Sequence, residues 1–356
     1  MQTQGPRVAM QASIGSSFDA IIDTRSPAEY AEDHIPGSIS APVLDDVERA
    51  EVGTLYQQVS PFEAKKRGAA LVAKNISRHV ETLFAGHPRS WRPLVYCWRG
   101  GKRSGAMAHI LREIGWVAAT LEGGYKAYRR WVVEQLEEVP LRFDFRVIHG
   151  PTGSGKSRFL ASLHSLRAQV LDLEGLAAHR GSVLGDLPDR AQPSQKMFDS
   201  LLLKELAGLD ASKPVFVEGE SKKIGQLQVP EALIQRMRTA ACVRLETSLE
   251  TRVSLLLEEY RHFLIDTGTL ADQLDCLAAL HGGEKIAQWK ALAASGQWRE
   301  FVGRLLVEHY DPAYRRSSER NFVRLPAAPV LRIDEVTGFA EAAARLLGKN
   351  PARVAA

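Results

Sequence analysis

Short apolar runs alternate with longer polar segments of helical character along most of the chain. In the first part of the chain the apolar runs predict three short buried strands, at residues 20–23, 94–95 and 117–121. Residues 26–29 read Ser-Pro-Ala-Glu and predict a helix start, because proline favours the first helical position and an acid the third. Strands that alternate with helices are typical of a parallel sheet covered on both faces, so we expect an α/β fold.

The second part of the chain repeats this alternation. Its apolar runs predict five strands, at residues 145–149, 169–173, 214–217, 242–245 and 330–333. Between the last two strands, apolar residues at helical spacing predict a helical subdomain at about residues 249–310. A linker at residues 137–141 separates the two parts, so we expect two domains, at residues 12–139 and 143–347.

The composition is that of an ordinary globular protein. The chain has 356 residues, 45% of them apolar and 25% charged, and its net charge of +4 permits a polyanionic partner without requiring one. No apolar run approaches the roughly 18 residues of a membrane span, and no signal peptide is evident, so we expect a cytoplasmic protein without membrane contact. Three cysteines are too few and too scattered for a disulfide framework or a zinc site, so we expect no metal-ligand cluster.

A glycine-rich loop follows the predicted strand at residues 94–95. It reads Cys-Trp-Arg-Gly-Gly-Lys-Arg-Ser over residues 97–104 and leads into a predicted helix. Backbone amides at such a helix start bind anions, and the nearby cations Arg99 and Arg103 favour a thiolate over a thiol. Cys97 is therefore the candidate nucleophile, with Arg99 and Arg103 as candidate catalytic partners. The spacing C-x5-R also fits a phosphatase loop in which Arg103 is the loop arginine.

A second anion-binding loop follows the predicted strand at residues 145–149. Residues 150–157 read Gly-Pro-Thr-Gly-Ser-Gly-Lys-Ser and match the phosphate-binding pattern GxxxxGK[ST]. The amides and the lysine of such a loop hold a di- or triphosphate, with or without a Mg²⁺ ion on the last hydroxyl. We expect no tightly bound cofactor. The candidate phosphate-binding residues are Gly150, Thr152, Gly153, Ser154, Gly155, Lys156 and Ser157.

Four acids follow predicted strands of the second part, and they are expected at one crevice: Asp172, Glu174, Glu218 and Glu220. Glu218 ends an apolar strand, as the acid of a nucleotide-hydrolysing P-loop protein does. Asp172 and Glu174 also suit a helix N-cap. The sequence offers no clear residue to position a catalytic water, which favours binding of a phosphate ligand without vigorous hydrolysis.

Two groups of cations suit contacts with phosphate or nucleic acid. His179 and Arg180 lie just beyond a predicted crevice strand. Arg315 and Arg316 belong to a late cluster of arginines interleaved with aromatic residues, a mixture typical of phosphate and base recognition. From the residues alone, both groups are about as typical of an ordinary charged surface.

The first part resembles a rhodanese domain, a domain that moves sulfur through a cysteine persulfide. The matching motifs follow in rhodanese order at residues 23–25 (Asp-Thr-Arg), 29–30 (Glu-Tyr), 34–37 (His-Ile-Pro-Gly), 97–104 and 122–124 (Glu-Gly-Gly). The usual sulfurtransferase loop has its arginine one position closer to the cysteine. We therefore expect a larger pocket here than in ordinary thiosulfate-handling rhodaneses.

A rhodanese domain fused to a P-loop domain resembles the tRNA 2-selenouridine synthase family. In the second part the resemblance rests on residues 172–175, 179–182, 192–195, 217–221 and 310–314. It implies that the chain replaces the sulfur of 2-thiouridine at the tRNA wobble position by selenium. It also implies geranyl diphosphate as the source of an S-geranyl-2-thiouridine intermediate and selenophosphate as the selenium donor.

The resemblance further implies the partners, which are the Lys, Glu and Gln acceptor tRNAs and an enzyme that supplies selenophosphate. Lys156 and its loop would hold the diphosphate, the helical subdomain would supply an apolar wall, and Cys97 would serve the exchange step. Two other functions stay open from the residues alone. One is a phosphatase-type enzyme built on C-x5-R, and the other is a nucleotide-gated tRNA-binding module.

Overall fold

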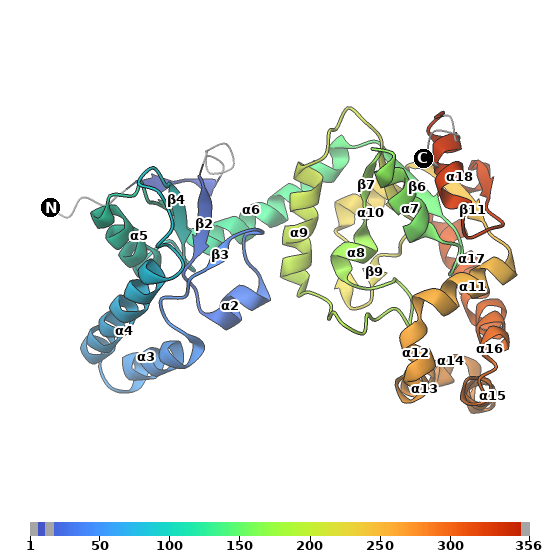
Figure 1. Ribbon diagram of the computed structural model, residues 1–356, viewed down its shortest axis with the longest axis horizontal. Helices are drawn as coiled ribbons and strands as arrows, with labels where there is room; N and C mark the ends of the chain where they lie inside the picture. Colours follow the sequence, from blue (N-terminus) through green and yellow to red (C-terminus); the bar gives the residue numbers. More distant parts are fainter. Residues whose placement is uncertain (1–5, 11–17, 350–356) are drawn as a thin grey trace. The chain divides into compact units, whose positions relative to one another are not determined.

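The computed structural model describes residues 6–10 and 18–349, so residues 12–17 of the first expected domain lie outside the described part. The chain forms two compact units (Figure 1). Unit 1 comprises Met1–Gln135 and Ser194–Lys204, and unit 2 comprises Leu136–Pro193 and Glu205–Ala356. Each unit contains its own parallel sheet, which confirms the predicted α/β fold.

Unit 1 is built on a five-stranded parallel sheet of order β1-β5-β4-β2-β3. Its strands are β1 (Arg7–Val8), β2 (Ala20–Asp23), β3 (Ile39–Ser40), β4 (Pro93–Tyr96) and β5 (Ala119–Leu121). The three strands predicted from apolar runs are present as β2, β4 and β5. All four residues of β4 are buried, as expected for a central strand covered on both faces.

The helices that begin in unit 1 are α2 (Pro27–Glu32), α3 (Asp46–Gln58), α4 (Pro61–Glu81), α5 (Lys102–Ile114) and α6 (Gly124–Glu138). Helix α2 begins where the sequence predicted, because the Glu29 side chain accepts a hydrogen bond from the Ser26 amide at 3.1 Å. Helix α4 buries Ile76 against Phe84 and Trp91 in the core of the unit. The loop of residues 97–101 lies between β4 and α5, and residues 102–104 of the same motif form the start of α5.

A segment from later in the chain also belongs to unit 1. Residues Ser194–Lys204 include most of α9 (Gln195–Ala207). Within this unit Ser200 donates a hydrogen bond to the buried Asp33 at 2.8 Å, and Tyr125 donates to the same carboxylate at 2.7 Å. Arg129 forms an ion pair with Asp199. The sequence pattern did not predict that a segment so distant along the chain belongs to unit 1.

Unit 2 is built on a second five-stranded parallel sheet, of order β12-β11-β6-β8-β7. Its strands are β6 (Phe145–His149), β7 (Gln169–Leu171), β8 (Val215–Glu218), β11 (Ala241–Glu246) and β12 (Val330–Arg332). All five predicted strands are present. The strand expected at residues 169–173 ends at Leu171, because Asp172 accepts a hydrogen bond from the Gly175 amide at 2.7 Å and caps the next helix.

Helices surround this sheet, and an antiparallel hairpin of β9 (Lys223–Ile224) and β10 (Leu227–Gln228) follows β8. The helices are η1 (Val139–Arg142), α7 (Lys156–Ser165), α8 (Leu173–Ala177), α10 (Glu231–Arg238), α11 (Leu249–Glu259), α17 (Asp311–Asn321), η3 (Leu325–Ala327) and α18 (Phe339–Leu346). Strand β6 lies between β8 and β11, so the phosphate loop that follows β6 lies centrally at the carboxyl edge of the sheet.

The predicted helical subdomain consists of several short helices. After α11 these are α12 (Arg261–Ile265), α13 (Thr267–Asp275), α14 (Ala278–His281), α15 (Gly283–Ala294), α16 (Trp298–Leu305) and the π-helix η2 (Leu306–Tyr310). The short helices pack around a core of their own that contains the fully buried Leu274 and Trp289. Among the described residues, no helix has the length and apolar character needed to cross a membrane.

Candidate active site

The Cys97 thiol lies in unit 1, in the loop between β4 and α5. Its sulfur accepts hydrogen bonds from the Gly101 amide at 3.3 Å and from the Ser104 hydroxyl at 3.2 Å. The side chain is buried, with 4% of the residue exposed. The loop thus surrounds the sulfur with donors, which is the arrangement that the glycine-rich sequence predicted.

These donors change the acidity of the thiol. Burial on its own raises the pKa of Cys97, but hydrogen bonds from the Ser104 hydroxyl and from the amides of Ser104, Gly101 and Arg99 outweigh that cost and lower the pKa. The acidified thiol is consistent with the sequence-based prediction of Cys97 as a nucleophile. The sequence analysis did not identify Ser104 as a site residue, although it is the last residue of the loop motif.

The glycine pair that follows β5 packs directly against the Cys97 loop. The Tyr125 amide donates a hydrogen bond to the Cys97 carbonyl at 2.8 Å. Gly124 has a φ of +56°, and a Cβ atom on it would lie 2.2 Å from that carbonyl oxygen. A side chain at this position is excluded, which gives a physical reason for the Glu-Gly-Gly motif at residues 122–124.

The two candidate arginines of this loop differ in their surroundings. Arg103 forms an ion pair with Glu29 at 2.8 Å, and Arg49 lies 3.4 Å from the same carboxylate. Arg99 is exposed at the tip of the loop. In this structure Arg99 is therefore the more available of the two for an anion above Cys97, whereas Arg103 has to exchange its carboxylate partner first.

Replacing Ser104 by alanine is expected to raise the pKa of Cys97, because the mutation removes a hydrogen bond that stabilises the thiolate. The thiolate fraction at neutral pH then falls, and the pH profile of iodoacetamide alkylation shifts to higher pH. Alkylation rates of the S104A and wild-type proteins, followed at Cys97 by peptide mass spectrometry, measure this shift. An unchanged profile would show that the backbone amides alone set the acidity.

The phosphate loop lies in unit 2, between β6 and α7. Lys156 donates a hydrogen bond from Nζ to the Gly150 carbonyl at 3.1 Å, so its ammonium group lies within the loop. Gly155 has a φ of +79°, and a Cβ atom there would lie 2.2 Å from the Phe339 ring. The buried Arg252 holds the loop from outside, with a hydrogen bond to the Thr152 carbonyl at 2.8 Å and an ion pair with Asp311 at 2.6 Å.

The crevice acids converge on the end of this loop. The Ser157 hydroxyl donates to Glu174 at 2.9 Å, and the Glu174 amide donates to Glu218 at 2.6 Å. Burial and the charges of Glu174 and Asp172 raise the pKa of Glu218 well above its usual range. Burial and the charge of Glu174 raise the pKa of Glu220 to about 7, although Lys156 opposes the shift.

Asp172 lies in the same crevice but also caps α8, so the structure gives it a structural role besides its place among the crevice acids. Glu174 lies in the first turn of that helix. Among the described residues, no group of three or more His, Cys, Asp and Glu side chains is arranged to hold a metal ion.

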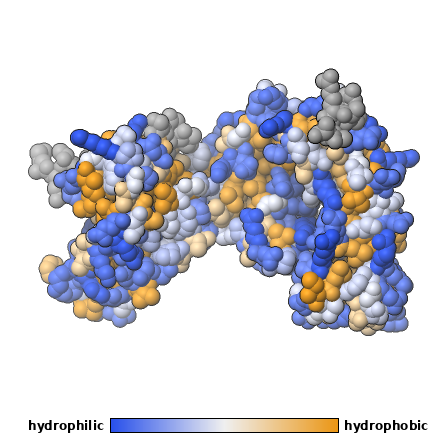
Figure 2. Space-filling view, viewed as in Figure 1, coloured by the Kyte–Doolittle hydropathy of each residue, from blue (hydrophilic) through white to orange (hydrophobic). Residues whose placement is uncertain are grey.

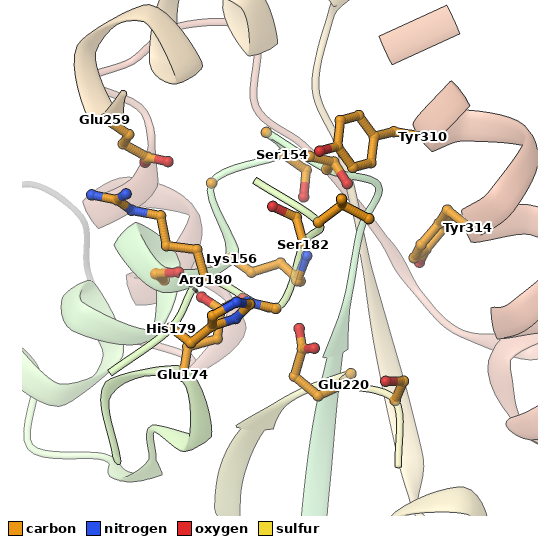
Figure 3. A pocket seen from close by; sticks show the side chains of 18 of the residues that line it. Ser154, Lys156, Glu174, His179, Arg180, Ser182, Glu220, Glu259, Tyr310 and Tyr314 are labelled. Carbon is orange, nitrogen blue, oxygen red and sulfur yellow. Dashed lines mark hydrogen bonds between the residues drawn. The ribbon is translucent and has the colours of Figure 1, made fainter. Parts of the chain in front are cut away.

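A cavity of about 520 Å³ opens beside the phosphate loop. Figure 3 shows Lys156 reaching across it, Arg180 extending toward Glu259 on one side, and Tyr310 and Tyr314 on the other. The Arg180 guanidinium stacks over the Tyr260 ring at 4.6 Å, and its buried Nη1 has no hydrogen-bond partner among the described residues. A cation so placed suits a phosphate group in the cavity. His179 also lines the cavity, and burial lowers its pKa.

A second, almost wholly apolar cavity of about 50 Å³ adjoins the first and lies against the helical subdomain. Both cavities are lined by Thr152, Ser182, Tyr260 and Tyr310. Its other walls are apolar side chains that include Leu256, Phe301 and Trp298. Figure 2 shows apolar atoms over α12, where Leu264, at the rim of this cavity, is 38% exposed.

The late arginines lie elsewhere in unit 2. Arg315 is exposed and lines a separate open groove together with Arg244 and Arg332. Arg316 is also exposed, and neither residue lines the 520 Å³ cavity. The structure therefore groups His179 and Arg180, but not Arg315 and Arg316, with the phosphate loop. The sequence analysis missed Tyr260 and His309 as cavity residues, although it singled out the neighbouring residues 310–314.

Comparison with known proteins identifies the family. The family profile described as "tRNA 2-selenouridine synthase AAA domain" matches residues 143–280, and the one described as "Rhodanese-like domain" matches residues 9–130. A protein of Nitrosomonas europaea named tRNA 2-selenouridine synthase is 35% identical over 67% of this chain and 63% of its own length. Proteins of the same name from Shewanella halifaxensis and Sulfurovum sp. are 31% and 30% identical, over 86% and 88% of this chain and 90% and 92% of their own lengths.

The match spans less than two thirds of the Nitrosomonas relative but about nine tenths of the other two. The two profile matches include the Cys97 loop and the phosphate loop. The chain belongs to the tRNA 2-selenouridine synthase family.

Proposed function

We propose that this protein replaces the sulfur of 2-thiouridine at the tRNA wobble position by selenium in two steps. In the first step the sulfur attacks geranyl diphosphate, a C–S bond forms, and diphosphate leaves. In the second step the selenium of selenophosphate forms a bond to C2 of the base, and the C2–S bond breaks to release geranylthiol. Water then cleaves the P–Se bond, which releases inorganic phosphate and leaves 2-selenouridine. The first step is assigned to the phosphate loop and the second to the Cys97 loop.

The observation that carries the proposal is the pair of adjoining cavities in unit 2. A prenyl diphosphate has a strongly anionic end and an apolar tail, and it needs a separate environment for each. Lys156 and Arg180 supply cations in the larger cavity, whereas the smaller one is lined by leucines and aromatic side chains. A nucleoside triphosphate has no group that requires the apolar cavity.

The apolar cavity holds only part of a geranyl tail at its present volume of about 50 Å³. The proposal therefore includes movement of side chains at its rim. Leu257 and Trp298 are only partly buried, and Leu264 is partly exposed, so these three have room to move aside. Tyr260 and Tyr310 line both cavities and would flank the carbon at which transfer occurs.

The oxygen donors next to the loop fit a Mg²⁺ ion that arrives with the diphosphate. The Ser157 hydroxyl and the Glu174 carboxylate are hard ligands, and phosphate oxygens and water would complete the octahedral shell. Such an ion would neutralise charge on the leaving diphosphate. Lys156 binds the same phosphates whether or not the ion is present.

The Cys97 loop suits the exchange step because it combines a thiol of lowered pKa with an anion-binding helix start. Selenophosphate is an anion, and the exposed Arg99 lies where its charge would assist binding. S-alkylation turns the sulfur of the base into a better leaving group, so the first step prepares the second.

Mass spectrometry of tRNA nucleosides tests the proposal. Thiolated tRNA is incubated with the purified protein and geranyl diphosphate, selenophosphate, both or neither. We expect S-geranyl-2-thiouridine with geranyl diphosphate alone, selenouridine with both donors, and no change with selenophosphate alone. Unchanged nucleosides with both donors would contradict the proposal. Release of phosphate from an aryl phosphate by the protein would instead support the phosphatase function of the C-x5-R loop.

Enlarging the apolar cavity is expected to change the preferred tail length. Trp298→Ala removes a large, partly buried side chain from its wall, so a longer farnesyl tail gains space. We expect the ratio of farnesyl to geranyl transfer to rise by about tenfold or more, since each methylene placed in a fitting apolar pocket contributes about 1–3 kcal/mol. Leu280→Ala, at an exposed site in the same subdomain, is the control. An unchanged ratio of farnesyl to geranyl transfer in W298A would show that the prenyl tail does not bind in the apolar cavity.

A further inference from the structure

A π-helix forms part of the cavity wall next to the phosphate loop. Helix α16 continues into η2 (Leu306–Tyr310), which passes directly into α17. The wider turn of a π-helix occurs frequently at functional sites, because it changes the direction of its side chains at a cost in helix stability. Two consecutive residues of this turn, His309 and Tyr310, are buried and line the cavity.

His309 is connected to a second histidine behind it. Its Nδ1 lies 2.9 Å from Nε2 of His281, which ends α14, and the two rings meet edge to face at 78°. His281 also contacts the Trp289 ring and is partly exposed. The other ring nitrogen of His309, Nε2, has no hydrogen-bond partner among the described residues, and its residue lines the cavity. The pair thus joins the cavity to the surface of the helical subdomain.

The first step of the proposed function has to dispose of one proton. When the thiouracil sulfur is alkylated, its C–S bond to the geranyl carbon forms and the bond from that carbon to the diphosphate oxygen breaks. The base then loses its N3 hydrogen as C2=S becomes C2–S–geranyl. A neutral product therefore requires a proton acceptor near the base.

On the basis of the proposed function, we propose that His309 accepts the N3 proton of the thiouracil during geranyl transfer, and that His281 passes a proton onward to solvent. In this scheme His309 accepts through Nε2 while its Nδ1–H donates to His281. The shared hydrogen bond fixes the ring orientation and provides the exit path. The balance is one thiouracil and one geranyl diphosphate converted to one S-geranyl base, one diphosphate and one proton.

The surroundings keep His309 in the form that accepts a proton. Burial lowers its pKa, and the charges of His281 and Arg316 lower it further. Burial, Lys285 and Arg316 lower the pKa of His281, whereas Glu308 opposes them. His179 is also a buried base of the cavity, but both of its ring nitrogens are engaged, because the Gly181 amide donates to Nδ1 at 3.0 Å and the Asp186 carboxylate lies 3.5 Å from Nε2. Glu220 is buried as well, and it lies in the field of Lys156. That position is on the phosphate side, where the leaving diphosphate binds.

Single-turnover geranyl transfer to thiolated tRNA, at saturating geranyl diphosphate, tests this role. We expect His309→Gln to lower the rate by about a hundredfold or more at neutral pH, the usual contribution of a general base. This reduction in rate should become smaller as the pH rises toward the pKa of the thiouracil N3–H, because an already deprotonated thiouracil needs no proton acceptor. Added imidazole should restore part of the rate to His309→Ala. His281→Gln is expected to reduce the rate less.

Three controls separate this role from a structural one and from the proposed function as a whole. His164→Gln, at an exposed position of α7, should behave like wild type. Calorimetric binding of geranyl diphosphate should be equal in wild type and H309Q, which shows that the variant is folded. A wild-type rate of geranyl transfer in H309Q would overturn the role of His309 but not the proposed function. The same holds if the rate of the His309 variants is reduced and neither high pH nor imidazole restores it. Absence of geranyl transfer by the wild-type protein would overturn the proposed function with it.

Discussion

Substitution of Lys156 by alanine is expected to lower geranyl transfer to thiolated tRNA by about 10²–10³-fold, the usual effect of removing one preorganised electrostatic contact to a developing charge. The ammonium group lies within the phosphate loop, bonded to the Gly150 carbonyl, where the diphosphate would replace that contact. Rapid-quench assays of S-geranyl-2-thiouridine measure the loss.

Two further measurements make the Lys156 result specific. Lys213→Ala, at a site where the lysine side chain is 68% exposed, should leave transfer unchanged. Transfer RNA that already carries S-geranyl-2-thiouridine should be converted to selenouridine by K156A at the wild-type rate, because the diphosphate-dependent step is bypassed. If K156A failed to convert this tRNA, Lys156 would be needed in both steps. If K156A transferred geranyl at the wild-type rate, the diphosphate would not bind in the phosphate loop.

Substitution of Cys97 by serine is expected to have the opposite pattern. Selenouridine formation should fall to background, because a serine hydroxyl is far less acidic and less nucleophilic than a thiol whose pKa is lowered by hydrogen bonds. Geranyl transfer should continue, so S-geranyl-2-thiouridine accumulates when both donors are present. Nucleoside mass spectrometry distinguishes the two products in one sample.

Cys276→Ser provides the matched control, because that cysteine is exposed in the helical subdomain. It should leave both products unchanged. Full selenation by C97S would contradict the assignment of the exchange step to the Cys97 loop. If C97S lost both geranyl transfer and selenation while K156A lost only geranyl transfer, Cys97 would also contribute to geranyl transfer.

Local sequence patterns predicted much of the fold and both anion-binding loops. Apolar runs located the eight predicted strands, and interior strands such as β4 and β8, which are buried along their whole length, leave a continuous apolar signature. The helix start at Ser26 followed from capping chemistry, and residues 97–104 and 150–157 were recognised from glycine, cation and hydroxyl spacing. Each of these features is specified by neighbours within a few residues.

Features that depend on distant contacts were not predicted. Ser200 joins unit 1 through its bond to the buried Asp33, which lies more than a hundred residues earlier in the chain. Arg103 resembles a free loop cation in sequence, but Glu29 holds it. His309 has no motif of its own, and its place in the cavity follows from the π-helix and from the packing of His281. Such relations arise only when separate elements pack together.

The time course of tRNA nucleosides in a single reaction tests most directly whether the two loops act in succession on one base. The protein, thiolated tRNA, geranyl diphosphate and selenophosphate are mixed, quenched at intervals and analysed by mass spectrometry. The account predicts that S-geranyl-2-thiouridine rises first and then declines as selenouridine appears after a lag. Selenouridine that forms without a lag, or at an equal rate when geranyl diphosphate is omitted, would contradict it.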